Sequence, residues 1–323
     1  MVNVRLTILL LINLLLYSIY TNAQTVSCPP NIDFEAGNFN NWNLYTGTCC
    51  PISTGTLSGA ITGRHTLMSG SATDFYGGLP VVAPSGGVYS LKLGNSSTGA
   101  QAERARYYVR VPSGVNNYSI IFRYAVVFED PSHTASEQPR FEVKAYDSAT
   151  NTVIPCSHFT YVASSSIPGF TLSGMGLNVY YKSWTTASLN LSGYAGRTVA
   201  VDFASGDCDL GAHFGYGYVD LNCGLFQIGY NACDTASTVT LSAPPGFSSY
   251  SWRDSSTMSV VGTGQSITIT RPATTTTYAV LLTPYTGFGC PDTLYTRVTI
   301  NNLTVNATND TNVCRNTTLH LNA

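Results

Sequence analysis

Residues 118–128, YSIIFRYAVVF, decide the fold class of this 323-residue chain. The large apolar or aromatic side chains stand at every second position: Tyr118, Ile120, Phe122, Tyr124, Val126 and Phe128. Ser119, Arg123 and Ala125 fall on the opposite face. A period of two is that of a β-strand, whose side chains point alternately to its two sides. The pattern therefore predicts one long strand with a buried face.

Shorter runs with the same alternation occur on both sides of this stretch, separated by clusters of Gly, Pro, Asn and Ser. They are Tyr107-Val109-Val111, Phe141-Val143-Ala145, Leu189-Leu191 and Val199-Val201-Phe203. Good helix formers are scarce, only 10% of residues are charged, and no stretch repeats with the helical period. Many strands punctuated by turn residues predict an all-β protein in which two half-apolar sheets bury each other.

The first residues predict export. Arg5 precedes an apolar run from Leu6 to Leu16, and the small or polar residues Thr21-Asn22-Ala23 follow it. That order is typical of a cleaved signal peptide, with the cut before Gln24. A retained membrane anchor is the alternative, but the apolar run is short for a span of about 20 residues. The chain is therefore expected to be secreted or displayed on the cell surface, and not to span a membrane once the signal is removed.

The pattern changes near residue 227. About 75 residues from Cys233 onward carry alternating strands, a central Trp252, and cysteines near both ends. These features predict a small immunoglobulin-like sandwich closed by a Cys233–Cys290 bridge. The tail around Cys314 repeats the residues around Cys233. The predicted domains are a signal peptide (1–23), a recognition domain (24–226), an immunoglobulin-like domain (227–302) and the start of a second, incomplete repeat (303–323) of a longer modular protein.

Nine cysteines in an exported chain predict disulfides rather than zinc. They are Cys28, Cys49, Cys50, Cys156, Cys208, Cys223, Cys233, Cys290 and Cys314. Adjacent Cys49 and Cys50 are expected in separate bridges. The run Asp207-Cys208-Asp209 with His213 looks like a metal cluster, but a Cys208–Cys223 bridge would consume its thiolate. A polar loop is therefore expected there. The full pairing of the six cysteines before residue 226 stays open.

Composition and motifs disfavour two functional classes. A formal net charge of −2 gives no electrostatic basis for binding nucleic acid or an anionic membrane. The chain lacks the local signatures of hydrolase nucleophile elbows, zinc proteases, phosphate-binding loops and dinucleotide-binding folds. We therefore expect this chain not to be an enzyme.

Three stretches of the first domain carry a family resemblance. They are NIDFEAG at residues 31–37 leading to Trp42, YSLKLG at 89–94, and HFGYGYVD at 213–220. They resemble the jelly-roll domains related to carbohydrate-binding modules and MAM-type domains. YSW at 250–252, TTTTY at 274–278 and Gly289-Cys290 resemble the PKD-like or immunoglobulin-like repeats of secreted, gliding-motility-associated proteins of Bacteroidetes-type bacteria.

This resemblance implies a jelly-roll β-sandwich followed by an immunoglobulin-like (PKD-like) β-sandwich. It also implies a structural calcium ion held by Glu35 and Asp220, with Asp33 a weaker addition, because Ca²⁺ binds several carboxylate and carbonyl oxygens. The alternative is that these carboxylates are solvated turn residues.

A glycan or a cell-surface or matrix ligand is the expected partner. Tyrosine is frequent, with 21 residues, and sugar rings stack on exposed aromatic side chains. Tyr108, Tyr181 and Trp184 are the candidate ligand-binding residues. Arg104, Arg106, Arg110 and Arg123 are expected to form a basic stripe, which either contacts acidic glycans or keeps a sheet face soluble.

Three functions fit these features. The first is a non-catalytic adhesin or scaffold whose immunoglobulin-like repeats act as spacers. The second is the carbohydrate-targeting N-terminal region of a secreted polysaccharide-degrading enzyme. The third is a purely structural role.

Overall fold

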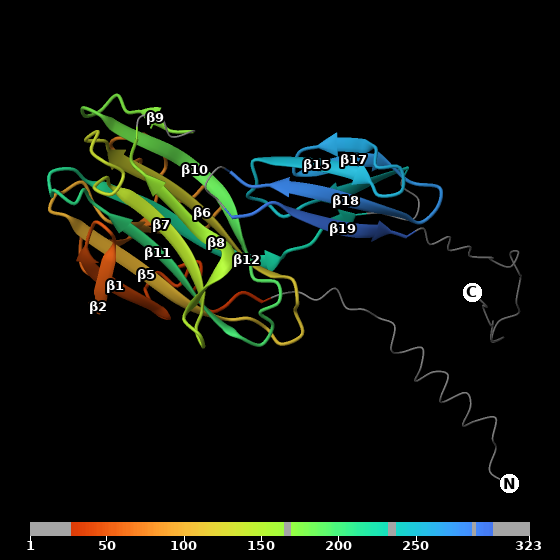
Figure 1. Ribbon diagram of the computed structural model, residues 1–323, viewed down its shortest axis with the longest axis horizontal. Helices are drawn as coiled ribbons and strands as arrows, with labels where there is room; N and C mark the ends of the chain where they lie inside the picture. Colours follow the sequence, from red (N-terminus) through yellow and green to blue (C-terminus); the bar gives the residue numbers. More distant parts are fainter. Residues whose placement is uncertain (1–26, 165–168, 232–236, 286–288, 300–323) are drawn as a thin grey trace, which may run out of the picture.

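The computed structural model describes residues 27–164, 169–231, 237–285 and 289–299. Within these ranges the regular secondary structure consists of β-strands alone (Figure 1). The predicted all-β class is confirmed. Within the described ranges, no helix long and apolar enough to cross a membrane is found. The predicted signal peptide, Cys233, Cys314 and the predicted incomplete repeat lie outside the described residues.

The first sandwich consists of two antiparallel six-stranded sheets that pack face to face, and consecutive strands repeatedly change sheet, as in a jelly roll. Sheet A has the order β2 (Ser53–Leu57), β1 (Trp42–Thr48), β5 (Gln101–Arg110), β11 (Thr198–Gly206), β7 (Arg140–Asp147) and β8 (Thr152–Val162). Sheet B has the order β3 (His65–Ser69), β4 (Tyr89–Leu93), β12 (Gly215–Leu225), β6 (Tyr118–Glu129), β10 (Val179–Asn190) and β9 (Thr171–Leu172).

The core between sheets A and B is built from the predicted apolar faces. The six alternating side chains of β6 from Tyr118 to Phe128 are each at most 1% exposed. The shorter runs around Val109, Val143, Leu189 and Val201 enter the same core. Burial of each such side chain contributes about 1.5–3 kcal/mol, so this cluster is the main source of stability in the first sandwich.

A second apolar cluster covers the outer face of sheet B. Leu79 and Val81, from the connection between β3 and β4, pack against Tyr216 and Tyr218 of β12. Asp74 in the same connection accepts hydrogen bonds from the hydroxyls of Tyr216 (2.8 Å) and Tyr218 (2.7 Å). The outer face of sheet B is therefore packed along these strands, whereas side chains on the outer face of sheet A, such as Tyr108, reach solvent.

The second sandwich has its own core. A three-stranded sheet, β13 (Gly229–Asn231), β14 (Thr238–Ser242) and β17 (Ser266–Thr270), faces a four-stranded sheet, β16 (Val260–Thr263), β15 (Ser249–Asp254), β18 (Thr276–Thr283) and β19 (Asp292–Val298). Trp252 is fully buried at the centre, and its indole nitrogen donates to the carbonyl of Gly264 at 2.9 Å. This layout is the one expected of an immunoglobulin-like domain.

The disulfides differ from those predicted. Among the described residues the bonded pairs are Cys28–Cys223, Cys49–Cys50 and Cys156–Cys290, and Cys208 is a buried free thiol. The predicted Cys208–Cys223 and Cys233–Cys290 bridges are therefore wrong, as is the expectation that Cys49 and Cys50 belong to separate bridges. The prediction relied on closeness in sequence, whereas the strands bring together cysteines that are 195 and 134 residues apart.

The two sandwiches lie next to each other (Figure 1), and the Cys156–Cys290 bridge joins them. Beside it, Ser188 donates a hydrogen bond to the carbonyl of Pro245 at 2.6 Å, and Asn190 donates to Asp292 at 3.2 Å. Gly246 lies so close that a Cβ there would come within 2.6 Å of the Cα of Ala187. A cavity of about 390 Å³ remains between the two bodies, so the contact is tight at these points and open between them.

Candidate functional site

The outer face of sheet A presents tyrosine rings among charged side chains. Along β5 the core-facing positions are Ala105, Tyr107 and Val109, so the residues between them point outward. The strand register places outward-facing side chains of β1, β7 and β11 beside them. We call the resulting set the sheet A face: Tyr45, Arg104, Arg106, Tyr108, Tyr146 and Asp202.

A fixed ion pair lies at the centre of the sheet A face. Arg106 donates from Nε to Oδ1 of Asp202 at 2.5 Å and from Nη2 to Oδ2 at 2.7 Å. This bidentate contact is the main reason that the pKa of Arg106 lies above its usual value. The guanidinium carbon lies 5.5 Å from the ring centre of Tyr146 and 5.9 Å from that of Tyr108. Because Tyr108 and Tyr146 flank Ala200 on the neighbouring strands, both rings lie in the row next to the Arg106–Asp202 pair.

A hollow of about 60 Å³ adjoins this ion pair. Arg104 lines it, stacks its guanidinium carbon 4.1 Å from the ring centre of Tyr45, and donates to the carbonyl of Thr54 at 2.9 Å. The Nε of Arg104 is buried without a hydrogen-bond partner. The other lining residues are Ile52, Thr54, Glu142, Lys144, Tyr146, Asp202 and Ala204. The hollow is too small for a sugar ring, but it offers donors and acceptors to a single polar substituent.

The structure does not bring the three predicted ligand-binding residues together. Tyr108 lies on the sheet A face and is 43% exposed. Tyr181 and Trp184 belong to β10 of sheet B and pack into the apolar cluster under the β3–β4 connection, where the Trp184 indole donates to the carbonyl of Pro80 at 2.7 Å. A ligand surface that combines all three residues is therefore excluded.

The predicted basic stripe is also divided between sheets. Arg104 and Arg106 are neighbours on β5, as expected, but Arg123 lies on β6 of sheet B opposite Asp220. Tyr45 and Tyr146 were missed by the sequence reasoning. Tyr146 could have been found, because it continues the outward alternation of β7 after Glu142 and Lys144.

Two acidic side chains, Glu35 and Asp220, lie beside the Gly86-Gly87 turn that precedes β4, and this is the predicted calcium site. Asp220 of β12 is fully buried, and neither of its carboxylate oxygens accepts a well-formed hydrogen bond. Burial is the main reason that the pKa of Asp220 is raised to about 7. The positive charge of Arg123, whose Nη1 lies 3.6 Å from Oδ2, acts to lower this pKa, as does the backbone amide of Leu221. The negative charges of Glu35 and Asp33 raise it further. Arg123 compensates the charge of this carboxylate only in part, because it makes no hydrogen bond to either oxygen. A buried carboxylate without hydrogen bonds is costly, so this site favours a further cation.

Glu35 approaches from the opening segment of the sandwich. Its carboxylate accepts hydrogen bonds from the amides of Val88 and Tyr89, with Oε1 at 3.0 Å from each nitrogen. A Cβ at Gly86 would lie 1.9 Å from Asp220 Oδ2, and one at Gly87 would lie 2.3 Å from Glu35 Oε1. The same two-glycine turn thus contacts both carboxylates, and a side chain at either position would fill the space between them.

Asp33 is less closely involved. Its Oδ1 accepts a hydrogen bond from the backbone nitrogen of Glu35 at 3.3 Å, and it acts on Asp220 through its charge. The chemistry of Glu35 and Asp220 fits a hard cation, which prefers carboxylate oxygens.

Comparisons with known proteins find solved structures that resemble this fold with low TM-scores. No family model matches the chain, and no curated protein matches it. A family 61 carbohydrate-binding module solved with β-1,4-galactotriose is 12% identical, with a TM-score of 0.33 over 61% of this chain and 97% of its own. A family 11 module from Clostridium thermocellum, solved with a mixed-linked β-1,3-1,4 tetrasaccharide, is 12% identical, with a TM-score of 0.27 over 59% of this chain and 91% of its own.

The third likeness is to the K3 cleaved adhesin domain of Lys-gingipain from Porphyromonas gingivalis. It is 13% identical, with a TM-score of 0.26 over 49% of this chain and 90% of its own. At these identities and TM-scores, neither ligand nor activity is transferred from the three structures to this chain.

Proposed function

We propose that the first sandwich binds a glycan on the sheet A face, as a non-catalytic recognition domain of a secreted or cell-surface protein. The observation that carries this proposal is the Arg106–Asp202 pair, which lies within 6 Å of the rings of Tyr108 and Tyr146 and beside a polar hollow. The disulfides support the proposed extracellular location, because such bonds persist in oxidising compartments.

The sheet A face offers contacts to both the apolar ring face and the hydroxyl groups of a sugar. The apolar C–H face of a pyranose ring stacks on tyrosine, and its hydroxyls accept hydrogen bonds from guanidinium groups and donate to carboxylates. The ion pairs hold these charged groups in place before a ligand arrives. Preorganisation of this kind lowers the entropic cost of binding.

The second sandwich is proposed to act as a spacer. Its core is separate from that of the first sandwich, and the Cys156–Cys290 bridge fixes one body to the other. A covalently attached, independently packed body can carry a recognition domain away from a surface without contacting the ligand.

A glycan array followed by calorimetry on the purified protein tests the binding proposal. We expect reproducible binding to at least one glycan, and an affinity loss of about 2- to 13-fold for Tyr108→Ala, because one stacked aromatic ring contributes about 0.5–1.5 kcal/mol beyond its burial. Tyr295→Ala is the matched control, since Tyr295 is 67% exposed on the second sandwich. No binding to any glycan, or equal losses in both variants, would exclude the sheet A face as a glycan site.

The Glu35–Asp220 pair is proposed as a structural calcium site. When bound, Ca²⁺ supplies positive charge to two carboxylates and so ties the opening segment to the closing strand β12. We expect EDTA to lower the melting temperature of the protein, added Ca²⁺ to restore it, and Asp220→Asn to remove the response. Asp254→Asn, a change at a surface turn of the second sandwich, is the control. Identical melting curves with EDTA and with Ca²⁺ would contradict the proposal.

A further inference from the structure

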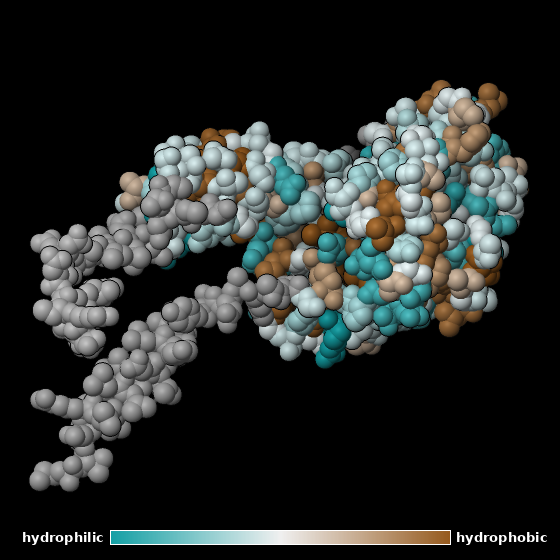
Figure 2. Space-filling model, turned by 180° about the vertical axis from the view of Figure 1, so that it is seen from behind, coloured by the Kyte–Doolittle hydropathy of each residue, from teal (hydrophilic) through white to brown (hydrophobic). Residues whose placement is uncertain are grey.

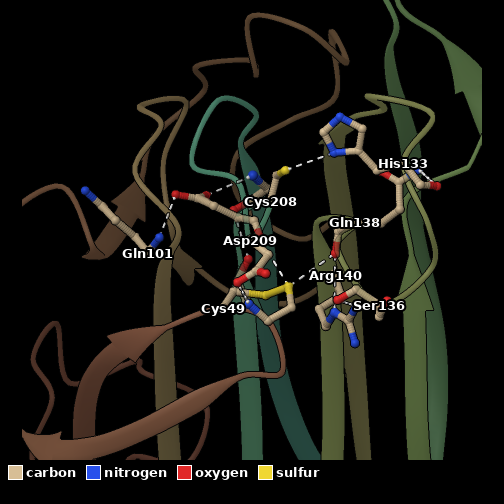
Figure 3. The surroundings of a disulfide bond; sticks show 12 residues. Cys49, Gln101, His133, Ser136, Gln138, Arg140, Cys208 and Asp209 are labelled. Atoms are coloured by element: carbon tan, nitrogen blue, oxygen red, sulfur yellow. Dashed lines mark hydrogen bonds between the residues drawn. A yellow bond between two sulfur atoms is a disulfide. The ribbon is translucent and has the colours of Figure 1, made fainter.

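Two histidines and the free cysteine converge at the turn between β11 and β12. His133, Cys208 and His213 each offer one metal-ligand atom, and the three atoms all lie within 4.8 Å of one another. The Sγ of Cys208 is 3.4 Å from Nδ1 of His133, and Figure 3 shows these two side chains facing each other. The two imidazole rings meet edge to face, with centres 5.3 Å apart.

The fold holds these residues in place through the backbone. The Cys208 amide donates to the His213 carbonyl at 3.0 Å, which closes the turn between the two ligands. Asp207 connects the same turn to β5 and β12, because its carboxylate accepts hydrogen bonds from the amides of Gln101 and Gly215, each at 3.1 Å. The backbone of this turn is therefore hydrogen-bonded to two strands independently of any ligand.

The third residue comes from the loop after β6, which is fastened to the same turn. The Asp209 amide donates to the carbonyl of Glu137 at 3.0 Å. Within the loop, Gln138 donates to the carboxylate of Asp130 at 2.8 Å and to the His133 carbonyl at 3.4 Å. Cys208 and His213 of one turn are thus brought together with His133, which lies 75 residues before Cys208 in the sequence.

Two unusual features point to a missing partner. Among the seven described cysteines, Cys208 alone is outside a disulfide, although it is buried. The Nδ1 of His213 is buried and makes no hydrogen bond. Buried polar atoms in native proteins nearly always have a partner, because leaving one without any is costly. A metal ion would satisfy both residues.

We propose that His133, Cys208 and His213 bind one Zn²⁺ ion. Zinc binds thiolate sulfur at about 2.3 Å and imidazole nitrogen at about 2.0–2.1 Å in a tetrahedron, which places sulfur and nitrogen ligands about 3.6 Å apart. The observed Sγ–Nδ1 distance of 3.4 Å is close to this value. Three protein ligands leave the fourth position to water. The ion joins the β11–β12 turn to the loop after β6, and binding releases the thiol proton.

The soft donors separate this site from the carboxylate pair of the proposed calcium site. Thiolate and imidazole prefer borderline or soft transition metals, whereas Ca²⁺ binds oxygen. The two proposals can therefore be tested in one preparation, because Ca²⁺ should not displace metal from the histidine–cysteine site.

The test uses the purified protein after chelation, titrated with Co²⁺ as a spectroscopic probe and then with Zn²⁺. We expect one Co²⁺ per chain, with a thiolate-to-cobalt charge-transfer band in the near ultraviolet that Zn²⁺ abolishes and excess Ca²⁺ leaves unchanged. Cys208→Ser should remove the band and weaken Zn²⁺ binding by more than the roughly 10–100-fold typical of changes outside the ligand set.

His213→Gln provides a second variant in case Cys208→Ser does not fold, and it should weaken Zn²⁺ binding in the same way. His158→Gln is the control, because His158 lies on β8, where its Nε2 contacts the hydroxyl of Thr160. Absence of a thiolate band, or equal Zn²⁺ affinity in wild type, Cys208→Ser and His213→Gln, would show that the three residues form only a packed thiol–imidazole contact. Tighter binding of Cu⁺ than of Zn²⁺ would overturn the assignment to zinc.

Discussion

His65 on β3 is 3% exposed, and its two ring nitrogens have different partners. Nε2 lies 3.1 Å from the carbonyl oxygen of Tyr45 and must donate to it, whereas Nδ1 accepts from the amide of Ile61 at 3.4 Å. A protonated ring would point a second N–H at the Ile61 amide. Burial lowers the pKa of His65 to about 4, and the charge of Arg64 acts in the same direction. The folded protein therefore holds this imidazole neutral.

The lowered pKa predicts a loss of stability in acid. Because the folded pKa lies below the unfolded value of 6.5, the unfolded chain binds the extra proton, and the stability present above pH 6.5 is lost as the pH falls toward 4. At pH 5 the loss from this group is about 2 kcal/mol, at 1.4 kcal/mol per pH unit. Urea unfolding of wild type and His65→Gln at pH 7 and pH 5 measures it.

In that comparison His65→Gln should lose less stability on acidification than wild type. Between pH 7.5 and 8.5 the two proteins should show the same dependence, because the ring is neutral in both the folded and the unfolded state. Equal losses between pH 7 and pH 5 would mean that the folded protein accommodates a protonated His65.

At the scale of whole strands, the sequence predicted which residues are buried better than which surfaces are open. The alternation of β5, β6, β7 and β11 identified the inner faces correctly, because a strand that packs on one side repeats every two residues. On β12, however, residues from Gly215 to Leu221 are buried on both faces. Periodicity cannot show that the β3–β4 connection covers the outer face, since that contact depends on segments far apart in the sequence.

The same limit explains the mixed outcome for the candidate sites. The pairing of Glu35 with Asp220 followed from a resemblance that covers both chain segments, and the structure places both beside the same glycine turn. Tyr181 and Trp184 were misplaced, because an outward-facing aromatic residue looks alike in sequence whether it meets solvent or a covering loop. The predicted disulfide pairings were wrong for a related reason. Which cysteines bond depends on how the sheets assemble, not on their spacing in the sequence.

At the scale of the whole molecule, the disulfide between the two sandwiches differs from the bridge that the sequence predicted for Cys290. Cys290 was expected to close the second sandwich on itself, but it bonds Cys156 of β8 instead. The second sandwich is held together by its core around Trp252, and within its described residues it contains no internal disulfide. The bridge therefore acts on the orientation of the two bodies rather than on the folding of one.

Removing this bridge should loosen the joint and leave both sandwiches folded. The bond spans 134 residues, for which the chain-entropy model gives a stabilisation of up to about 5 kcal/mol. Without it, the side-chain hydrogen bonds of Ser188 and Asn190 remain beside a cavity of about 390 Å³. For the double variant Cys156→Ser/Cys290→Ser we expect a larger radius of gyration in X-ray scattering and two separate transitions in calorimetry.

The control is Cys28→Ser/Cys223→Ser, which removes a bridge within the first sandwich. It should lower the melting temperature of that sandwich while the scattering curve of the folded protein stays the same, because the joint is untouched. If the scattering curve of Cys156→Ser/Cys290→Ser also matches wild type and its melt stays a single transition, the noncovalent contacts around Gly246 suffice to fix the two bodies. In that case the spacer is rigid without its disulfide, because the close approach of Gly246 to Ala187 determines the orientation.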